Sequence, residues 1–217
     1  MTDAVLTIRR SVTRPSADVL GRLQGIPTGW VVDAQGRRGA VDPGIRRLVG
    51  SGVICGPALT VWTAPRDNLA PYAALEVATG DYAGASVIGD LFAGMARNSG
   101  VAAVVTDGLA RDIEGLRQVG IPLFARGLTP NSPLKQGPGE IGSRISLGGV
   151  TIEAGDLVVG DEDGVVVIPR ATAADVLQAL EAVRAKEHDM EAKIQAGLKQ
   201  PPWLSQILTG GVVRFED

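Results

Sequence analysis

Apolar residues recur along this chain in two patterns, and polar residues or glycines separate the segments that carry them. Helical spacing after a polar residue predicts amphipathic helices, which a glycine or a proline ends. Short β-branched runs, or alternation of apolar and polar residues, predict strands. Both patterns occur along the chain, so we expect an α/β fold in a single domain over residues 1–217, with a core at about 28–170.

The expected helices start at residues that suit a helix N-terminus. Ser16 and Thr28 are the expected caps of two short helices. Thr172, with Asp175 three residues on, resembles a capping pair for a long charged helix that the Pro201-Pro202 pair ends. The predicted helices cover residues 17–24, 28–34 and 91–98, a segment after residue 112, and about 172–198.

Strands are expected where β-branched or alternating residues lie between turn signals. The Gly56-Pro57 pair interrupts the first of them, which predicts an edge position or a bulge there. Residues 73–78 fit a strand or a helix equally well. The predicted strands cover residues 53–62, 101–105, 121–126, 141–150, 151–159 and 165–168.

The segment 89–112 has a spacing with a simple geometric meaning. Asp90 opens a helix, residues 101–105 form a buried strand, and Arg111 and Asp112 begin the next helix. A path of this kind folds back on itself, so both ends can face one crevice. That crevice would hold two carboxylates, a guanidinium and the N–H groups of a helix N-terminus. Such a set suits a divalent cation and a small organic acid.

Each of these residues also has an ordinary structural interpretation. A carboxylate such as Asp90 or Asp112 at a helix start is most often a cap, because it satisfies N–H groups and favours the helix dipole. Arg111 alone could be a surface residue. Their convergence on one crevice favours a functional site over three separate structural roles.

Composition removes several classes of function. A formal net charge of −3 without a long basic run gives no electrostatic reason to bind nucleic acid or an anionic membrane. Cys55 is the single cysteine, so no intrachain disulfide can form and a reducing, cytoplasmic location is expected. The single histidine, His188, lies in a charged helix, which argues against a His-based metal site or triad. We also find no candidate membrane span or signal peptide.

Other motif-like stretches have simpler interpretations. Residues 137–142 match G-x-G-x-x-G but lead into a strand, the reverse of the dinucleotide-binding context. Residues 161–164 resemble a calcium loop, but a hairpin turn fits better because Val165 stands where an oxygen ligand is needed. Cys55 lies in an apolar run, which predicts a buried side chain rather than a nucleophile.

The Gly89-Asp90 pair, followed after a further twenty residues by Arg111-Asp112, resembles the signature of the class II pyruvate aldolases that cleave 4-hydroxy-4-methyl-2-oxoglutarate. That family includes regulators of ribonuclease E activity and proteins once labelled dimethylmenaquinone methyltransferase-like. The likeness runs from about Thr28 to about Gly197. Between residues 68 and 90 this chain is shorter than the corresponding segment of the family. Further similar stretches are residues 40–45, 56–61, 122–130 and 155–169.

The resemblance implies a three-layer β-β-α swivelling-domain fold of the phosphohistidine-domain type. It also implies homotrimers or homohexamers with active sites between subunits. Carried over, Asp112 holds Mg²⁺ or Mn²⁺, and Arg111 contacts the keto or enolate oxygen of the pyruvate moiety. Asp90 orients water at the metal.

The resemblance assigns the remaining contacts to backbone and to a second subunit. The amides of Leu91 and Phe92, after Gly89, bind the substrate carboxylate. A glutamate on the C-terminal helix of a neighbouring subunit takes part in the site; by spacing it is Glu187, with Glu191 as the alternative. A solvated helix face is the competing interpretation of either glutamate.

The activity that the resemblance implies is metal-dependent cleavage of a 4-hydroxy-2-oxo acid to pyruvate. Oxaloacetate decarboxylation is expected as a second activity, since it passes through the same enolate. The alternative is a non-catalytic regulator that binds a ribonuclease E-type partner through its trimer surface. The intact Arg111-Asp112 pair favours the lyase. Methyl transfer lacks support, because no glycine-rich loop follows a strand and opens a helix.

Overall fold

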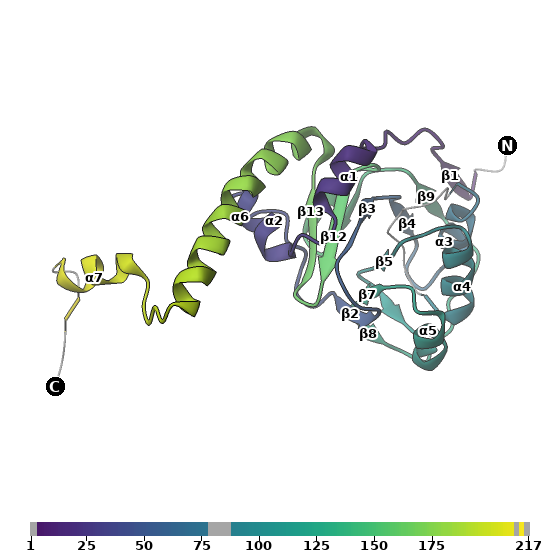
Figure 1. Ribbon diagram of the computed structural model, residues 1–217. Coiled ribbons are helices and arrows are strands. Elements are labelled where there is room, and N and C mark those ends of the chain that lie inside the picture. The colour runs from purple at the N-terminus through teal and green to yellow at the C-terminus, as the bar shows by residue number, and fades with distance from the viewer. Residues whose placement is uncertain (1–3, 78–87, 211–212, 215–217) are drawn as a thin grey trace. The chain divides into compact units, whose positions relative to one another are not determined.

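The computed structural model describes residues 4–77, 88–210 and 213–214 of the chain (Figure 1). The chain divides into two compact units, residues 1–180 and 181–217. The second unit contains the C-terminal part of α6 (Ala173–Gln195) and the whole of α7 (Pro202–Thr209). The end of the ambiguous 73–78 segment and most of the shortened stretch before residue 90 lie outside the described residues.

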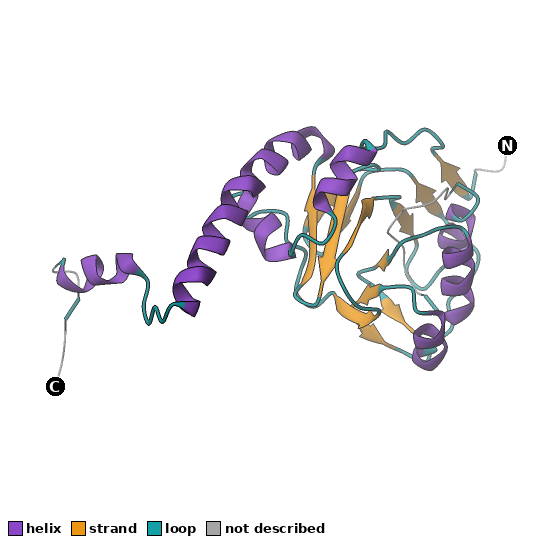
Figure 2. Cartoon of the chain, viewed as in Figure 1, coloured by secondary structure: helices purple, strands orange, loops and turns teal. Residues whose placement is uncertain are grey.

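The first sheet of the first unit is antiparallel, with strand order β13-β12-β3 (Figure 1), and Figure 2 draws its strands in orange. Its register places Val159 opposite both Cys55 and Val166. Side chains alternate between the two faces of a strand, so Val158 packs into one core cluster and Val159 into another. The strands are β3 (Ile54–Pro57), β12 (Leu157–Asp161) and β13 (Gly164–Ile168).

The second sheet has strand order β2-β7-β5. Phe124 of β7 packs into the core that it shares with Val158 of the first sheet. Leu123 and Ala125, on the opposite face, pack against Phe92 and other residues of the covering helices. The strands are β2 (Arg46–Val49), β5 (Val104–Val105) and β7 (Leu123–Ala125), and the helices are α4 (Asp90–Asn98) and α5 (Ile113–Val119).

Helices therefore cover the outer faces of two stacked sheets. On the first sheet, buried residues of α1 (Ala17–Leu23) and α2 (Thr28–Ala34) pack with those of β12, β13 and the start of α6. The mixed α/β class predicted from the sequence is confirmed, whereas the swivelling-domain assignment and the single-domain organisation stay predictions. No helix within the described ranges is long and apolar enough to cross a bilayer.

Smaller strand groups complete the first unit. One sheet has the order β1-β9-β4, and α3 (Leu69–Ala74) packs against it. The pairs β10–β11 and β6–β8 are antiparallel and parallel, respectively. These strands are β1 (Leu6–Ile8), β4 (Val61–Thr63), β6 (Leu109–Ala110), β8 (Gly127–Leu128), β9 (Gly139–Ile141), β10 (Ile145–Leu147) and β11 (Val150–Ile152).

The predicted strand 53–62 is two strands in different sheets. The chain leaves the first sheet after Pro57, passes through Ala58–Thr60 and enters the β1-β9-β4 sheet at Val61. β3 is an edge strand, as the Gly56-Pro57 pair predicts. Both segments are apolar because β3 is buried throughout and Val61 belongs to a core cluster, so hydrophobicity alone could not locate the change of sheet.

Two predicted helix caps are wrong. Thr28 is the first residue of α2 rather than its cap, and its N–H and hydroxyl donate to the Asp161 carboxylate at 2.8 and 2.7 Å. The Thr172 hydroxyl donates to the Pro169 carbonyl at 3.1 Å, within the 3₁₀ turn η1 (Arg170–Thr172). A tertiary partner and a local turn have replaced the two caps.

The predicted end of the long helix is also displaced. α6 ends at Gln195, just before Gly197, which has a φ of +96°. A glycine in this left-handed conformation commonly follows a helix C-terminus. Pro202 begins α7, since a proline in the first turn sacrifices no helical hydrogen bond.

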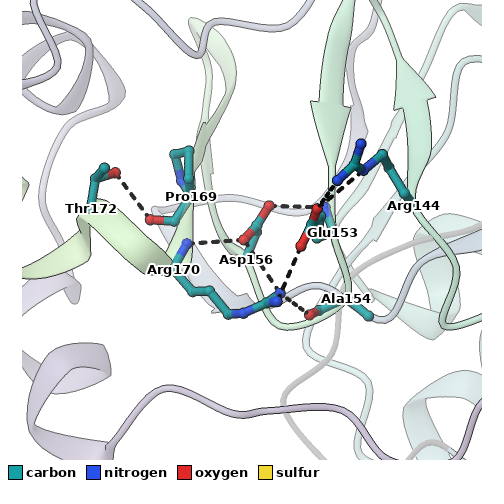
Figure 3. A network of polar contacts seen from close by, with 7 residues as sticks. All are labelled: Arg144, Glu153, Ala154, Asp156, Pro169, Arg170 and Thr172. Carbon is teal, nitrogen blue, oxygen red and sulfur yellow. Dashed lines mark hydrogen bonds and ion pairs between the residues drawn. The ribbon is translucent and has the colours of Figure 1, made fainter.

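A polar network fastens the start of α6 to the turn that precedes β12 (Figure 3). The buried Asp156 carboxylate accepts the backbone N–H groups of Glu153 and Arg170, both at 2.9 Å. The Glu153 carboxylate pairs with Arg144 at 2.5 Å and with Arg170 at 3.1 Å. The hydrogen bond from Arg144 is the main cause that holds the pKa of Glu153 below its usual value.

Candidate active site

The predicted crevice exists, as a cavity of about 140 Å³ in the first unit. It lies where α4 begins and where the chain turns into α5. Residues 88–90 and 110–112 are brought together by a parallel bridge between Ile88 and Ala110, and the Arg111 N–H donates to the Ile88 carbonyl at 2.9 Å. The cavity is lined by Asn68, Tyr72, Gly89, Asp90, Leu91, Phe92, Arg111, Asp112, Ser132, Pro133 and Lys135.

The Arg111 guanidinium is held on two sides. Its Nε lies 3.0 Å from Oδ2 of Asp112, and its Nη1 donates to the Ser132 hydroxyl at 2.5 Å. Among the described residues Nη2 has no partner. Fixing two edges of a planar guanidinium leaves its third edge oriented for an anionic or carbonyl oxygen of a ligand.

Asp112 does not behave as an ordinary cap. It occupies the N-cap position of α5, yet its side chain makes no capping hydrogen bond. Its backbone is left-handed, with φ 58° and ψ 46°, a conformation that costs a non-glycine residue about 1–3 kcal/mol. The structural explanation of this carboxylate is thereby weakened, because the strain holds a carboxylate beside Arg111 without satisfying the helix.

Asp90 retains part of a structural role. Its Oδ1 accepts the Leu91 N–H at 2.7 Å. The sequence had led us to expect a free Leu91 amide for a substrate carboxylate, but this amide is already engaged. Leu91 is 72% exposed, whereas Phe92 is buried and its ring packs edge-to-face on Tyr72, with the ring centroids 5.4 Å apart. Phe92 therefore anchors the first turn of α4 in the core, whereas Leu91 in the same turn faces solvent.

Two glycines allow the acidic side chains to lie so close to the backbone. A Cβ on Gly89 would lie 2.7 Å from Oδ2 of Asp112, and a Cβ on Gly115 would lie 2.3 Å from Oδ2 of Asp90. Gly115 is within α5, where glycine is otherwise unfavourable. Glycine is thus needed at both positions because the Asp112 and Asp90 side chains occupy the space that a Cβ would fill.

The donor set fits a hard divalent cation. No three or more His, Cys, Asp or Glu side chains cluster as a metal cage anywhere in the described parts of the chain. Magnesium ordinarily uses one or two carboxylates and completes its shell with water and substrate oxygens. Asp112, with Asp90 nearby, could supply that number. Glu187 and Glu191 lie in the second unit, and their part in the site stays a prediction.

Sequence reasoning missed the residues that close the crevice from the other side. Ser132 and Lys135 lie in the turn-rich stretch after β8, where no periodicity marks them. Asn68 lies just before α3; it is buried, and its carboxamide oxygen accepts no hydrogen bond from the described residues. The lysine brings a second cation to the crevice, 5.9 Å from the centre of the Tyr72 ring.

The residues set aside at the sequence level are structural. Cys55 is buried, and burial raises the pKa of its thiol to about 11, which is unsuited to a nucleophile. Residues 137–142 enter strand β9, and residues 161–164 close the β12–β13 hairpin. None of them lines the crevice.

Comparison with known proteins gives the chain a family. The family model described as RraA-like, Aldolase/RraA, matches residues 28–167, a span that includes both halves of the crevice. The chain belongs to the Aldolase/RraA family. The resemblance found in the Gly89-Asp90 and Arg111-Asp112 pairs is confirmed at this level. A similar protein of Halalkalibacterium halodurans, provisionally named 4-hydroxy-4-methyl-2-oxoglutarate aldolase, is 36% identical over 194 residues, which are 85% of this chain and 91% of that protein.

Solved structures agree with this family assignment. A protein of Pseudomonas syringae pv. tomato has a TM-score of 0.75 at 28% identity, covering 86% of this chain and 96% of its own. The RNA-processing inhibitor RraA of Thermus thermophilus has a TM-score of 0.59 at 27% identity, covering 66% and 93%. The Streptomyces coelicolor RraAS2 structure has a TM-score of 0.72 at 24% identity, covering 87% of this chain and 100% of its own. At this identity it supports the fold alone.

Proposed function

We propose that this Aldolase/RraA member is a divalent-metal-dependent lyase that cleaves a 4-hydroxy-2-oxo acid to pyruvate. Substrates of the 4-hydroxy-4-methyl-2-oxoglutarate type fit the relative's name, and oxaloacetate decarboxylation is the second activity. The observation that carries the proposal is the crevice itself. There Asp112 is strained, does not cap its helix and lies 3.0 Å from a guanidinium with one uncommitted edge.

The chain's own groups have distinct tasks in this reaction. Asp112 would hold Mg²⁺ or Mn²⁺, with Asp90 orienting water beside it. Bound there, the metal supplies Lewis-acid stabilisation of negative charge on the oxygens of a 2-oxo acid. The uncommitted Nη2 of Arg111 would donate to the C2 oxygen of the substrate. The N–H of Phe92 and the cation of Lys135, two residues that line the crevice, would bind the substrate carboxylate.

Cleavage of the substrate begins with a proton transfer and proceeds through an enolate. A base, for which we propose a water held by Asp90, takes the proton of the C4 hydroxyl. The C3–C4 bond breaks, C4 becomes a carbonyl, and the electron pair moves onto C3 and the C2 oxygen as the pyruvate enolate. Arg111 stabilises the charge that develops on that oxygen. Protonation at C3 completes pyruvate, and loss of CO₂ from oxaloacetate forms the same enolate.

Part of the proposed site lies between copies of the chain. We infer a homotrimer or homohexamer in which Glu187 of α6 approaches the crevice of a neighbouring copy. Glu187 is partly buried and Glu191 exposed along the same helix. We expect Glu187→Gln to lower turnover much more than Glu191→Gln; the reverse order would assign the role to Glu191, and parental turnover in both variants would remove both from the site.

The activity is tested by pyruvate release from oxaloacetate and from 4-hydroxy-4-methyl-2-oxoglutarate. Asp112→Ala and Arg111→Ala should each lower kcat/KM by at least about 100-fold, as for other preorganised charge-stabilising groups. EDTA should abolish the activity and Mg²⁺ restore it. Arg117→Ala is the matched control: Arg117 lies in α5, exposed and paired with Glu114, and its loss should change the rate little. Near-parental rates for both site variants would refute the assignment.

A second function is favoured by one comparison. The Thermus thermophilus RNA-processing inhibitor is 27% identical to this chain, so a regulatory role through a ribonuclease E-type partner is the alternative. It predicts that a pull-down captures the partner equally well with the parent and with Asp112→Ala. The lyase proposal predicts turnover by the parent without any partner present.

A further inference from the structure

The segment between β8 and β9 brings Ser132 to the crevice and holds it there. Where β6 and β8 end, the Thr129 N–H donates to the Ala110 carbonyl at 2.9 Å, so the segment starts beside the end of β6. Further along, the Leu134 N–H donates to the Arg66 carbonyl at 2.7 Å. Ser132 therefore lies on a short stretch of chain that is fastened on both sides.

Two more features restrict this stretch. Pro130 and Pro133 each fix a backbone φ at about −65°, and Pro133 also confines Ser132, the residue before it, to extended backbone. The buried Asp67 carboxylate accepts the Gln136 N–H at 2.6 Å, which fastens the stretch to the loop before α3. Ser132 is exposed, but its backbone has little freedom, so its hydroxyl is presented to the crevice in a defined position.

The Ser132 hydroxyl is the neutral one of the two partners of the Arg111 guanidinium. It accepts Nη1 at 2.5 Å, whereas Nε lies 3.0 Å from Oδ2 of Asp112. In the proposed function Asp112 also holds a divalent cation, and that positive charge competes with the guanidinium for the same carboxylate. The hydroxyl carries no net charge, so its hold on Nη1 is not opposed in this way.

We propose that Ser132 is a positioning residue of the lyase, which acts by orienting Arg111. This inference rests on the proposed function and deepens it. With Nη1 held by Ser132 and Nε by Asp112, the uncommitted Nη2 is left in one orientation for donation to the C2 oxygen of the substrate. Without the hydroxyl, the contact with Asp112 alone does not fix the guanidinium. A donor displaced by about 1 Å stabilises a developing charge far less well.

The test compares Ser132→Ala with Ser132→Thr, which keeps a hydroxyl, in pyruvate release by the full-length chain. Because Arg111 acts on charge that develops during the reaction, Ser132→Ala should lower kcat roughly 3- to 10-fold, the value of one hydrogen bond, and change KM less. Ser132→Thr should keep most of the parental kcat. The matched control is Ser146→Ala, at an exposed residue of β10 outside the crevice lining, which should keep the parental kcat.

Two further measurements separate positioning from a merely structural role. In the Arg111→Ala background, Ser132→Ala should cause little additional loss of kcat, because the group that Ser132 orients is already gone. The second measurement needs neither metal nor turnover. In the metal-free protein, NMR relaxation of the Arg111 Nε–H should show a more mobile side chain in Ser132→Ala than in the parent or in Ser146→Ala.

Three results would overturn the inference about Ser132. They are a parental kcat in Ser132→Ala, an equal fold-loss of kcat in the parent and Arg111→Ala backgrounds, and unchanged mobility of the Arg111 Nε–H. A near-parental rate in Arg111→Ala itself would instead refute the proposed function on which the inference rests. The two failures are therefore distinguishable.

Discussion

Replacing Gly115 by alanine tests whether the position of Asp90 matters. The added Cβ would lie 2.3 Å from Oδ2, 2.7 Å from Cβ and 2.8 Å from Cγ of Asp90. These distances are too short for a rotation of the carboxylate alone to relieve them, because the Asp90 Cβ is itself involved. We expect Asp90 and the first turn of α4 to move outward.

The effect on stability and the effect on catalysis should separate. Alanine inside a helix is favoured over glycine by about 0.8–1 kcal/mol, which offsets part of the cost of the displacement. A displacement of about 1 Å in a catalytic constellation can lower the rate roughly 100-fold. We therefore predict a variant with a melting temperature within a few degrees of the parent and with kcat/KM for pyruvate release lowered about 10- to 100-fold.

Gly94→Ala provides the matched control. Gly94 lies in the facing helix α4, and its added Cβ would meet only a Val119 methyl at 4.0 Å, an ordinary contact. This variant should gain some stability and keep parental kcat/KM. Full activity of Gly115→Ala, with Asp90 displaced in its structure, would show that the position of this carboxylate is irrelevant to turnover.

Three further predictions concern buried groups. Burial alone would raise the pKa of Asp67, but N–H donation from Gln136 and Leu69 lowers it below its usual value. Its contribution to stability is therefore present above about pH 4 and lost as the pH falls through the folded-state value, so Asp67→Asn should flatten the acid limb of the unfolding free energy. An unchanged limb would contradict this. The Cys55 thiol, with a pKa raised to about 11, should resist alkylation at pH 8 until the protein unfolds. Fast labelling of the native protein would count against its burial. Asp156→Ala should lower the unfolding free energy by about 2 kcal/mol in urea, because two backbone donors lose a charged acceptor, while Asp18→Ala, at an exposed residue of α1, should change it little.

The proximity of Asp90 and Arg111 could be predicted from the sequence because it depends on local order. A helix start, its glycine end and one buried strand determine which ends meet, and the structure places both residues at one crevice. The same reasoning could not predict Lys135 or Asn68, which reach the crevice from loops and helix starts without periodic signals. Tertiary partners decide such positions.

Local rules failed where a distant residue competed for the same group. Thr28 has the right residue type for a cap, yet it is the first residue of α2, and its N–H and hydroxyl both donate to the Asp161 carboxylate of the β12–β13 hairpin. The change of sheet between β3 and β4 was invisible for a related reason, since core residues on both sides of Ala58 have the same hydrophobicity. Long-range packing, which no window of sequence contains, decides both.

The central claim is that Asp112 and its neighbours hold a divalent cation together with a 2-oxo acid. The most direct measurement is an electron paramagnetic resonance titration of Mn²⁺ into the full-length protein, with and without oxalate as a mimic of the enolate. We predict one bound Mn²⁺ per chain, tighter binding with oxalate, and loss of that site in Asp112→Ala but not in Arg117→Ala. Equal Mn²⁺ binding by the parent and by Asp112→Ala, with no effect of oxalate, would contradict the account.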